Sequence, residues 1–488
     1  MTGLPATVLL LLAGLLAVVI AFATLEHRQL GLAAAAASYV LVPSYFGARN
    51  IGPDFPVLYL PTLIVAAVVL LWAAMRRLPP VPRGPAFLVL NLAVFAFVIG
   101  IVYQDPSAAT LGYSLNQVLA PFALFVLTWS LWREEPTLGR NAALFILSLA
   151  AIESVVAVAT AVGLIPQPYL AFYERNVWWG AQEGRFPGTM DHPLVLGMFV
   201  AMCVPLIAYV RSTWMSVVLI LLLSSGVALT QSRIAVVGGL LAAAYVLVFA
   251  ARGGSKRVVM MCAGAMAGVV LTAAGAVAKV QERIVRDRGS TIARQYAWDY
   301  FGETWRNFIW SGVGNANQKS YFEAVGLTSS GESALVCLIV SFGLLLTVVL
   351  FGAVLLVLAR SIRYHHAITP GVVTAGVAVA SVQFFSSIGN ADNSSGALWI
   401  ALTLAIVAPG VKTSERSSRP RPDDRQGARR DDDRDAHLVN DGHVQANRAA
   451  AFRRVRGDAL NTGREVDLLS GRELTSRRTR GHGLHRGL

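Results

Sequence analysis

The chain has 488 residues, of which 55% are hydrophobic and only 14% carry a charge. That balance excludes an ordinary soluble protein, in which about a quarter of the residues are charged, and predicts a polytopic membrane protein. The formal net charge of +13 does not predict binding to nucleic acid, because the basic residues follow apolar runs or lie in the tail. No nucleic-acid partner is therefore expected.

Apolar runs long enough to cross roughly 30 Å of hydrocarbon recur along the chain. We predict an all-α integral membrane protein with twelve or thirteen transmembrane helices. The first run lacks the basic start and cleavage site of a secretory signal, so we interpret it as the first helix. The runs lie at about 5–24, 29–46, 57–75, 85–103, 109–132, 142–164, 193–210, 214–231, 234–250, 258–278, 333–359, 371–388 and 394–409.

The distribution of Lys and Arg predicts the orientation of the helices. Basic residues gather in short connections such as Arg76-Arg77 and Lys256-Arg257, and again from Lys412 onward. Cytoplasmic connections are enriched in such residues. We therefore predict a protein of the inner (cytoplasmic) membrane with its C-terminus in the cytoplasm. The segments 165–192 and 279–330 are then on the extracytoplasmic side.

Three regions follow from this pattern. Residues 1–164 form N-terminal transmembrane helices, and residues 165–410 form a transmembrane core with the two long extracytoplasmic loops. Residues 411–488 are rich in Arg, Asp, Gly and Ser, so they cannot bury a core and are expected to be a disordered, basic cytoplasmic tail. The tail either touches anionic lipid or is merely solvated.

The first loop, 165–192, mixes aromatic and charged residues. Trp178 and Trp179 offer flat indole faces on which sugar rings stack, and an interfacial aromatic belt is the alternative interpretation. In the second loop, 279–330, aromatic residues recur at helical spacing from Ile292. This pattern predicts an amphipathic helix at the membrane surface, started by Gly289-Ser290 and followed by a flexible glycine turn at 311–315.

Three arginines stand out at the predicted outer face: Arg185, Arg233 and Arg294. Arg233 lies where two spans join in only a few residues, a place in which a guanidinium needs an anionic partner or lipid phosphates. Snorkelling to the interface is the alternative for any one of them. Together they fit a diphosphate, because Arg binds phosphate bidentately and stays charged in apolar surroundings.

The order of motifs between about 180 and 350 resembles the O-antigen ligase and O-antigen polymerase family. Each motif is short, and the match lies in their order and membrane placement. The motifs are Arg185-Phe186-Pro187-Gly188-Thr189 with His192-Pro193, then Ser232-Arg233, then Arg294 with Trp298, then Gly312-Val313-Gly314 and a span containing Gly343.

This resemblance implies a metal-independent glycosyltransferase that needs no cofactor. It would transfer a glycan from undecaprenyl diphosphate to a lipid-linked glycan or to a final acceptor. Arg185 and Arg233, with Arg294, would bind the pyrophosphate, and Trp298 would contact sugar. The partners implied are the undecaprenyl-diphosphate-linked oligosaccharide, membrane lipid, a glycan acceptor and proteins of polysaccharide assembly.

The general base is open at this stage. Ligases of this type carry a His just before the span that begins here near Glu332, where this chain reads Glu332-Ser333. Glu332 is either the base or, with Ser329, a capping box. His192 with Asp191 is the other candidate, and this pair also suits a helix start, with Asp191 near the N-cap and Pro193 in the first turn.

The missing His favours a polymerase slightly over a ligase. A transporter of lipid-linked oligosaccharide is the alternative from another class, although transporters more often hold charges near mid-membrane and show repeated halves. A scaffold for other envelope enzymes would depend on the tail alone.

Overall fold

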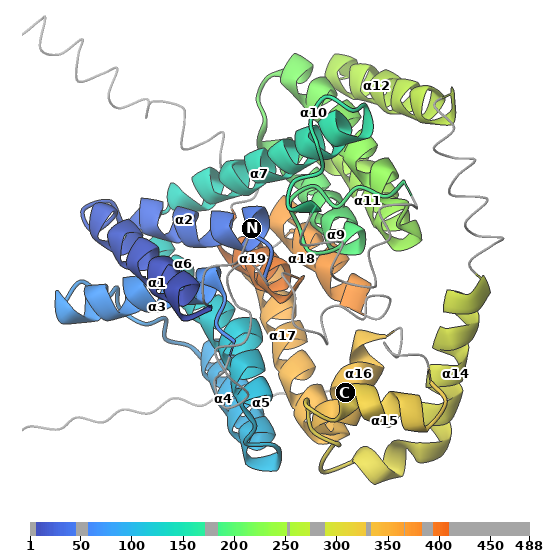
Figure 1. Ribbon diagram of the computed structural model, residues 1–488. Helices are drawn as coiled ribbons and strands as arrows, with labels where there is room; N and C mark the ends of the chain where they lie inside the picture. Colours follow the sequence, from blue (N-terminus) through green and yellow to red (C-terminus); the bar gives the residue numbers. More distant parts are fainter. Residues whose placement is uncertain are drawn as a thin grey trace, which may run out of the picture. The chain divides into compact units, whose positions relative to one another are not determined.

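The computed structural model describes residues 6–44, 57–170, 184–250, 254–273, 288–327, 333–365, 367–382 and 394–408. Every regular element within these ranges is a helix, which confirms the predicted all-α fold (Figure 1). The predictions for Trp178, Trp179, Glu332 and the tail at 411–488 lie outside the described residues.

The helices follow the apolar runs closely. The α-helices are α1 (Ala6–Ala23), α2 (Arg28–Leu41), α3 (Leu60–Ala74), α4 (Pro85–Gln104), α5 (Ala108–Tyr113), α6 (Ala120–Glu134), α7 (Leu138–Ala161), α9 (Pro193–Cys203), α10 (Thr213–Thr230), α11 (Arg233–Tyr245), α12 (Gly254–Ala273), α14 (Arg288–Thr304), α15 (Gln318–Ala324), α16 (Ala334–Phe342), α17 (Leu344–His365), α18 (Pro370–Ser381) and α19 (Ser394–Val407). Short π or 3₁₀ segments adjoin them: η1 (Ser114–Leu119), η3 (Val204–Tyr209), η4 (Val246–Ala250) and η5 (Trp305–Phe308).

In the described part of the chain, five helical stretches are long and apolar enough to cross a membrane. They are α4, the continuous stretch Ala108–Glu134, α7, α10 and α17. Shorter apolar helices of 10–17 residues accompany them. The protein is therefore a membrane protein with several spanning helices, and the count of twelve or thirteen stays a prediction.

Side-chain contacts tie the helix connections together at one end of the bundle, which we call the basic end. It comprises the connections around 24–28, 75–84, 133–140, 210–212, 254–257 and 367–369. Each contact joins two segments that are distant in sequence. They are Arg77 to the Leu25 carbonyl, Arg28 to Glu134 at 2.6 Å, Lys256 to the Val210 carbonyl and Tyr245 to the Ile368 carbonyl.

The other ends of the same helices form what we call the loop end, made by residues 42–44, 57–59, 105–107, 162–170, 184–192, 231–232 and 309–314. Here too, hydrogen bonds join distant segments, as with the backbone N–H of Tyr59 and the side chain of Asn116 at 3.1 Å. The N–H of Phe186 donates to Leu229 O, so the predicted outer segment 184–192 lies at the same end of the bundle as the α10–α11 turn.

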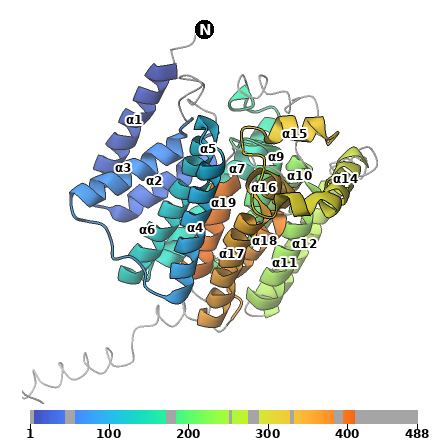
Figure 2. The ribbon, with the colours of Figure 1, turned by 90° about the horizontal axis from the view of Figure 1, so that it is seen from below.

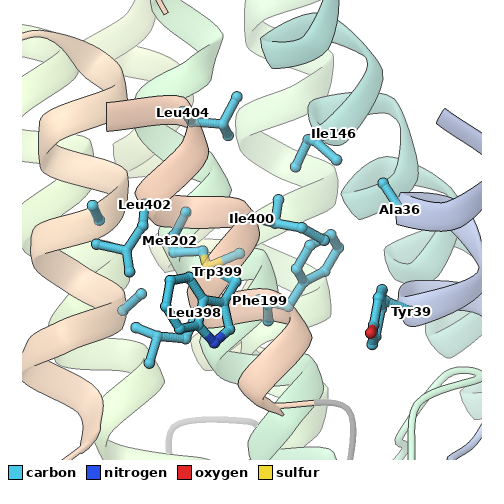
Figure 3. Packing of buried hydrophobic residues seen from close by; sticks show 14 of the residues in the cluster. Ala36, Tyr39, Ile146, Phe199, Met202, Leu398, Trp399, Ile400, Leu402 and Leu404 are labelled. Atoms are coloured by element: carbon cyan, nitrogen blue, oxygen red, sulfur yellow. The ribbon is translucent and has the colours of Figure 1, made fainter. Parts of the chain in front are cut away.

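The core of the bundle surrounds α19, in which all 14 residues are buried. A helix that is apolar on every side is expected at the centre of a bundle. Figure 3 shows Trp399, Ile400 and Leu404 of α19 among side chains from α2, α7 and α9. Figure 2 shows α4, α17, α18 and α11 running alongside one another, and each of these helices contacts the next in that order.

The predicted span at 333–359 is a broken helix. α16 ends at Phe342 and α17 begins at Leu344, with Gly343 between them at φ +99°. A left-handed backbone of this kind favours glycine, which has no Cβ.

The segment 311–314 closes this break by binding the carbonyls at the end of α16. The N–H of Val313 donates to Val340 O at 2.8 Å, and the N–H of Gly314 donates to Ser341 O at 3.0 Å. Gly312 packs so closely that a Cβ there would lie 2.2 Å from the Ser341 carbonyl carbon. The expected flexible glycine turn is thus a docked cap for a helix end.

α16 presents opposite faces to two apolar clusters. Ala334, Leu338 and Phe342 belong to the main core. Its other face joins a second cluster with α14, η5 and α15, the elements that lie together in Figure 1. The second cluster contains Ala297, Phe308, Phe322, Leu327, Val336, Cys337, Ile339 and Val340. The predicted amphipathic helix is therefore α14, which begins at Arg288, slightly before the expected start.

Candidate functional site

The segment that begins at Gly184 is bound to the end of α10. The N–H of Phe186 donates to Leu229 O at 3.2 Å, and the side-chain amide of Gln231 donates to Gly184 O at 3.1 Å. The Nε–H of Arg185 donates to Thr230 O at 3.0 Å. The bonds to Leu229 O and Thr230 O satisfy carbonyls that the last turn of a helix leaves without intrahelical donors. Together the three bonds hold Arg185 beside the α10–α11 turn.

The turn itself is short and rigid. Gln231 adopts the left-handed conformation (φ 51°, ψ 30°), and the Ser232 hydroxyl caps α11 by accepting from Ala235 N at 3.3 Å. Arg233 is the first residue of α11 and is half-buried. A cation at a helix N-terminus opposes the helix dipole, so Arg233 does not stabilise α11. The same position suits the binding of an anion.

A second helix N-terminus adjoins this turn. Gly197, in the first turns of α9, lies so near that a Cβ would be 2.8 Å from both Thr230 Oγ1 and Ala235 Cβ. The starts of α9 and α11 therefore pack against each other. Helix N-termini present N–H groups and partial positive charge. The structure thus gathers two arginines and two positive helix ends at the loop end.

Asp191 lies next to the N-cap of α9, as expected, but the capping side chain is that of His192. Its carboxylate is buried, with 4% of the residue exposed. It accepts from Ser44 N at 2.7 Å and from the Ser44 hydroxyl. The carboxylate faces the backbone that follows α2, so it accepts from Ser44 rather than from the N–H groups at the start of α9. Asp191 therefore fastens the loop to the residues that follow α2.

His192 is the N-cap of α9. Its Nδ1 accepts from Leu194 N at 2.9 Å, and Pro193 occupies the first helical position as expected. An Nδ1 that accepts is unprotonated, so a neutral ring in this geometry carries its proton on Nε2. The structure therefore gives His192 a capping role, and a catalytic role for it stays a prediction.

Sequence reasoning missed Glu153 of α7, which is fully buried (0% exposed). Its Oε2 accepts from Thr189 N at 2.8 Å, and its Oε1 accepts from the Thr189 hydroxyl. The signal was present, because a lone carboxylate inside a 24-residue apolar helix marks a polar or functional position. The long apolar run around Glu153 makes this carboxylate less conspicuous in the sequence than the charges in the loops.

Two residues from the 162–170 connection complete the surroundings of Glu153. The side-chain amide of Gln167 donates to Gly188 O at 2.7 Å, and the Tyr169 hydroxyl donates to Leu41 O at 3.4 Å. Burial, and next the negative charge of Glu153, raise the pKa of the Tyr169 hydroxyl. Tyr169 is therefore a neutral phenol that covers this polar cluster.

Arg294 and Trp298 both lie on α14, and Trp298 packs on the second cluster with its ring centroid 5.8 Å from that of Phe301. The structure gathers Arg185, Arg233, Asp191 and His192 at the loop end. No contact described here joins Arg294 or Trp298 to those four residues. α16 is capped by the hydroxyl of Ser333, and the alternative roles of Glu332, as a base or in a capping box with Ser329, concern residues outside the described part of the chain.

Among the described residues, no group of three or more His, Cys, Asp and Glu is arranged to hold a metal ion. Of the three cysteines, Cys203 and Cys337 are buried and Cys262 is exposed. No family model matches the chain, and no curated protein or solved structure matches it either.

Proposed function

We propose that the protein is a membrane glycosyltransferase that transfers a glycan from undecaprenyl diphosphate to a glycan or lipid-linked acceptor. The observation that carries this proposal is the convergence of Arg185 and Arg233 on one turn at the loop end, where the Nε–H of Arg185 binds Thr230 O. The resemblance of the motif order to the O-antigen ligase and polymerase family supplies the substrate class.

The site suits a diphosphate for electrostatic reasons. Two guanidiniums and the N-termini of α9 and α11 supply positive charge at one place. The hydrogen bond from Nε of Arg185 to a backbone carbonyl holds its guanidinium beside the α10–α11 turn. Such fixed donors stabilise charge as it develops on a leaving group.

The reaction is a displacement at the anomeric carbon of the donor glycan. An acceptor hydroxyl forms a bond to that carbon as the bond between the carbon and the diphosphate oxygen breaks. The base takes the hydroxyl proton, and undecaprenyl diphosphate leaves with the bonding electron pair. Glu332 and His192 are the candidate bases, and Asp191 has a structural role in binding Ser44.

The proposal assigns the loop end to the outer face of the cytoplasmic membrane. Support comes from the basic end, where Arg28, Arg77 and Lys256 lie in connections of the kind enriched in the cytoplasm. A polymerase is slightly favoured over a ligase, because Glu332-Ser333 replaces the His expected of a ligase.

Purified protein in liposomes tests the proposal. An undecaprenyl-diphosphate oligosaccharide is supplied with EDTA, and products are followed by gel and mass spectrometry. We expect a ladder of longer lipid-linked glycans, which Arg185→Ala and Arg233→Ala abolish. Arg211→Ala is the matched control, since Arg211 is exposed at the start of the same α10 hairpin but at the basic end.

The other outcomes separate the alternatives. One transfer to an added acceptor indicates a ligase. Movement of the lipid-linked sugar across the bilayer without covalent change indicates a transporter and overturns the proposal. Equal loss of activity in all three arginine variants defeats the specific role of the loop end.

A further inference from the structure

We propose that Glu153 is a positioning residue for the donor diphosphate, because it holds the segment 186–190 in the conformation that aims Arg185. This inference rests on the proposed function. Glu153 has no exposed surface, so it acts through the loop rather than on the substrate.

The contact between Glu153 and the loop is close and uses both carboxylate oxygens. Thr189 donates its N–H to Oε2 at 2.8 Å and its hydroxyl to Oε1. At Gly188 (φ +63°), a Cβ would lie 2.2 Å from the same Oε2. The turn therefore needs glycine at 188 both for its backbone conformation and for room beside the carboxylate.

The position of Glu153 is fixed in turn by the packing of α7 on α10. At Gly226, a Cβ would lie 2.4 Å from Ser154 Oγ, so the two helices cross at very short range. Small residues permit such close approach of helices in membranes. Gly226 is about one helical turn before Thr230, and Thr230 O is the acceptor for Arg185. The crossing thus places the carboxylate beside the end of α10 that holds Arg185.

A buried carboxylate is an expensive way to fasten a loop in a membrane protein. Unless it is hydrogen-bonded, its burial opposes folding strongly. Glu153 lies beside the segment that carries Arg185, and its side chain supplies two acceptor oxygens to Thr189. A fixed segment matters at such a site, because a misplacement of about 1 Å can lower a catalysed rate about 100-fold.

Hydrogen exchange and donor binding test this role in the full-length protein in nanodiscs. The variants are Glu153→Leu, Glu153→Gln and Thr189→Val, with Ser148→Ala as the control on an exposed face of α7. The readouts are exchange of the peptide 184–193 and the Kd for undecaprenyl diphosphate, followed by KM and kcat for transfer.

We expect Glu153→Leu to speed exchange of the peptide, weaken binding about tenfold, the order of one hydrogen bond, and raise KM more than it lowers kcat. Thr189→Val should act in the same direction without touching α7. Glu153→Gln should stay close to wild type. Its amide oxygen accepts the Thr189 N–H, its NH₂ group donates to the hydroxyl, and the hydroxyl then donates to Val40 O, which is already 3.4 Å away.

Three outcomes overturn the inference. Unchanged exchange and binding in both Glu153→Leu and Thr189→Val show that the loop does not depend on this contact. A Glu153→Gln variant as impaired as Glu153→Leu shows that charge, rather than hydrogen-bond geometry, is required. Wild-type protein that binds no undecaprenyl diphosphate, while exchange still responds to Glu153→Leu, defeats the proposed function and leaves Glu153 a purely structural anchor.

Discussion

The Nε–H of Arg185 donates to the backbone carbonyl of Thr230 at 3.0 Å, across 45 residues of sequence. Thr230 precedes Arg233 by three residues, so this bond brings the motif that begins at Arg185 next to the Ser232-Arg233 motif. The guanidinium is thereby oriented by the protein before any ligand arrives.

Arg185→Lys should therefore behave nearly as poorly as Arg185→Ala. A lysine ammonium is a point charge and cannot bond the Thr230 carbonyl while presenting two further parallel donors to a phosphate. We expect at least about a tenfold loss of affinity for undecaprenyl diphosphate, measured in nanodiscs. Wild-type affinity in the lysine variant would show that charge alone is sufficient.

Asp191→Ala should destabilise the protein. The Ser44 N–H and hydroxyl are buried donors to this carboxylate, and an unsatisfied buried donor costs about 1–3 kcal/mol. Thermal unfolding in detergent measures the loss. In the double variant with Ser44→Ala, the two effects should be less than additive, whereas simple additivity would mean that the pair is not coupled.

Gly312→Ala should be strongly destabilising, because its Cβ would meet the backbone of Ser341, which cannot move aside. Overpacking of this kind costs about 1–3 kcal/mol, and displacement of the turn would also break its bonds to α16. Gly302→Ala is the matched control, since no atom lies within 4 Å of the place that a Cβ would take there. That control should be neutral or slightly stabilising. Equal melting temperatures for the two variants would contradict the docked turn.

Asp105 should make the docking of the turn sensitive to acid. Partial burial by itself would raise the pKa of Asp105, but hydrogen bonds from the Thr110 hydroxyl, the Ala316 N–H and Ser107 outweigh it and lower the pKa below 3.8. A lowered carboxyl pKa contributes stability that is fully present above the ordinary value and is lost as pH falls through the folded value.

Exchange of the peptide 309–317 as a function of pH measures this effect. As pH falls below the ordinary aspartate value and through the lowered pKa of Asp105, protonation of this carboxylate should loosen the segment in the wild type. Asp105→Asn should remove that step and leave faster exchange at neutral pH. An acid transition that survives unchanged in Asp105→Asn would assign it to other carboxyl groups.

His192→Asn should separate capping from catalysis. Asparagine is a strong N-cap, whereas His192→Ala loses the bond to Leu194 N and should cost about 1 kcal/mol. We expect the asparagine variant to keep both stability and transfer activity, because the structure uses the ring as a cap. A stable but inactive asparagine variant would make His192 the base in place of Glu332.

Much of the helical framework was predictable from the chain. Apolar runs locate spans because backbone polar groups must be satisfied inside each segment, and residues such as Pro193 and Ser232 mark helix starts by their local chemistry. The break at Gly343 escaped prediction, since its partner is the turn around Gly312, about thirty residues away in the chain.

The site was predictable in part. Arg185 and Arg233 were found because cations beside apolar spans are conspicuous, and the structure brings both to one turn. Asp191 and Glu153 were misjudged or missed because their partners, Ser44 and Thr189, come from distant segments. Nothing in the local spacing of a carboxylate shows which remote donor it will meet.

The two faces of α16 have a consequence for unfolding. Leu338 belongs to the main core, and Val336 and Val340 belong to the second cluster. If the second cluster separates from α16, the apolar face of α16 that carries Val336 and Val340 is exposed. Loss of either cluster withdraws support from the other, so both are expected to melt in a single cooperative transition.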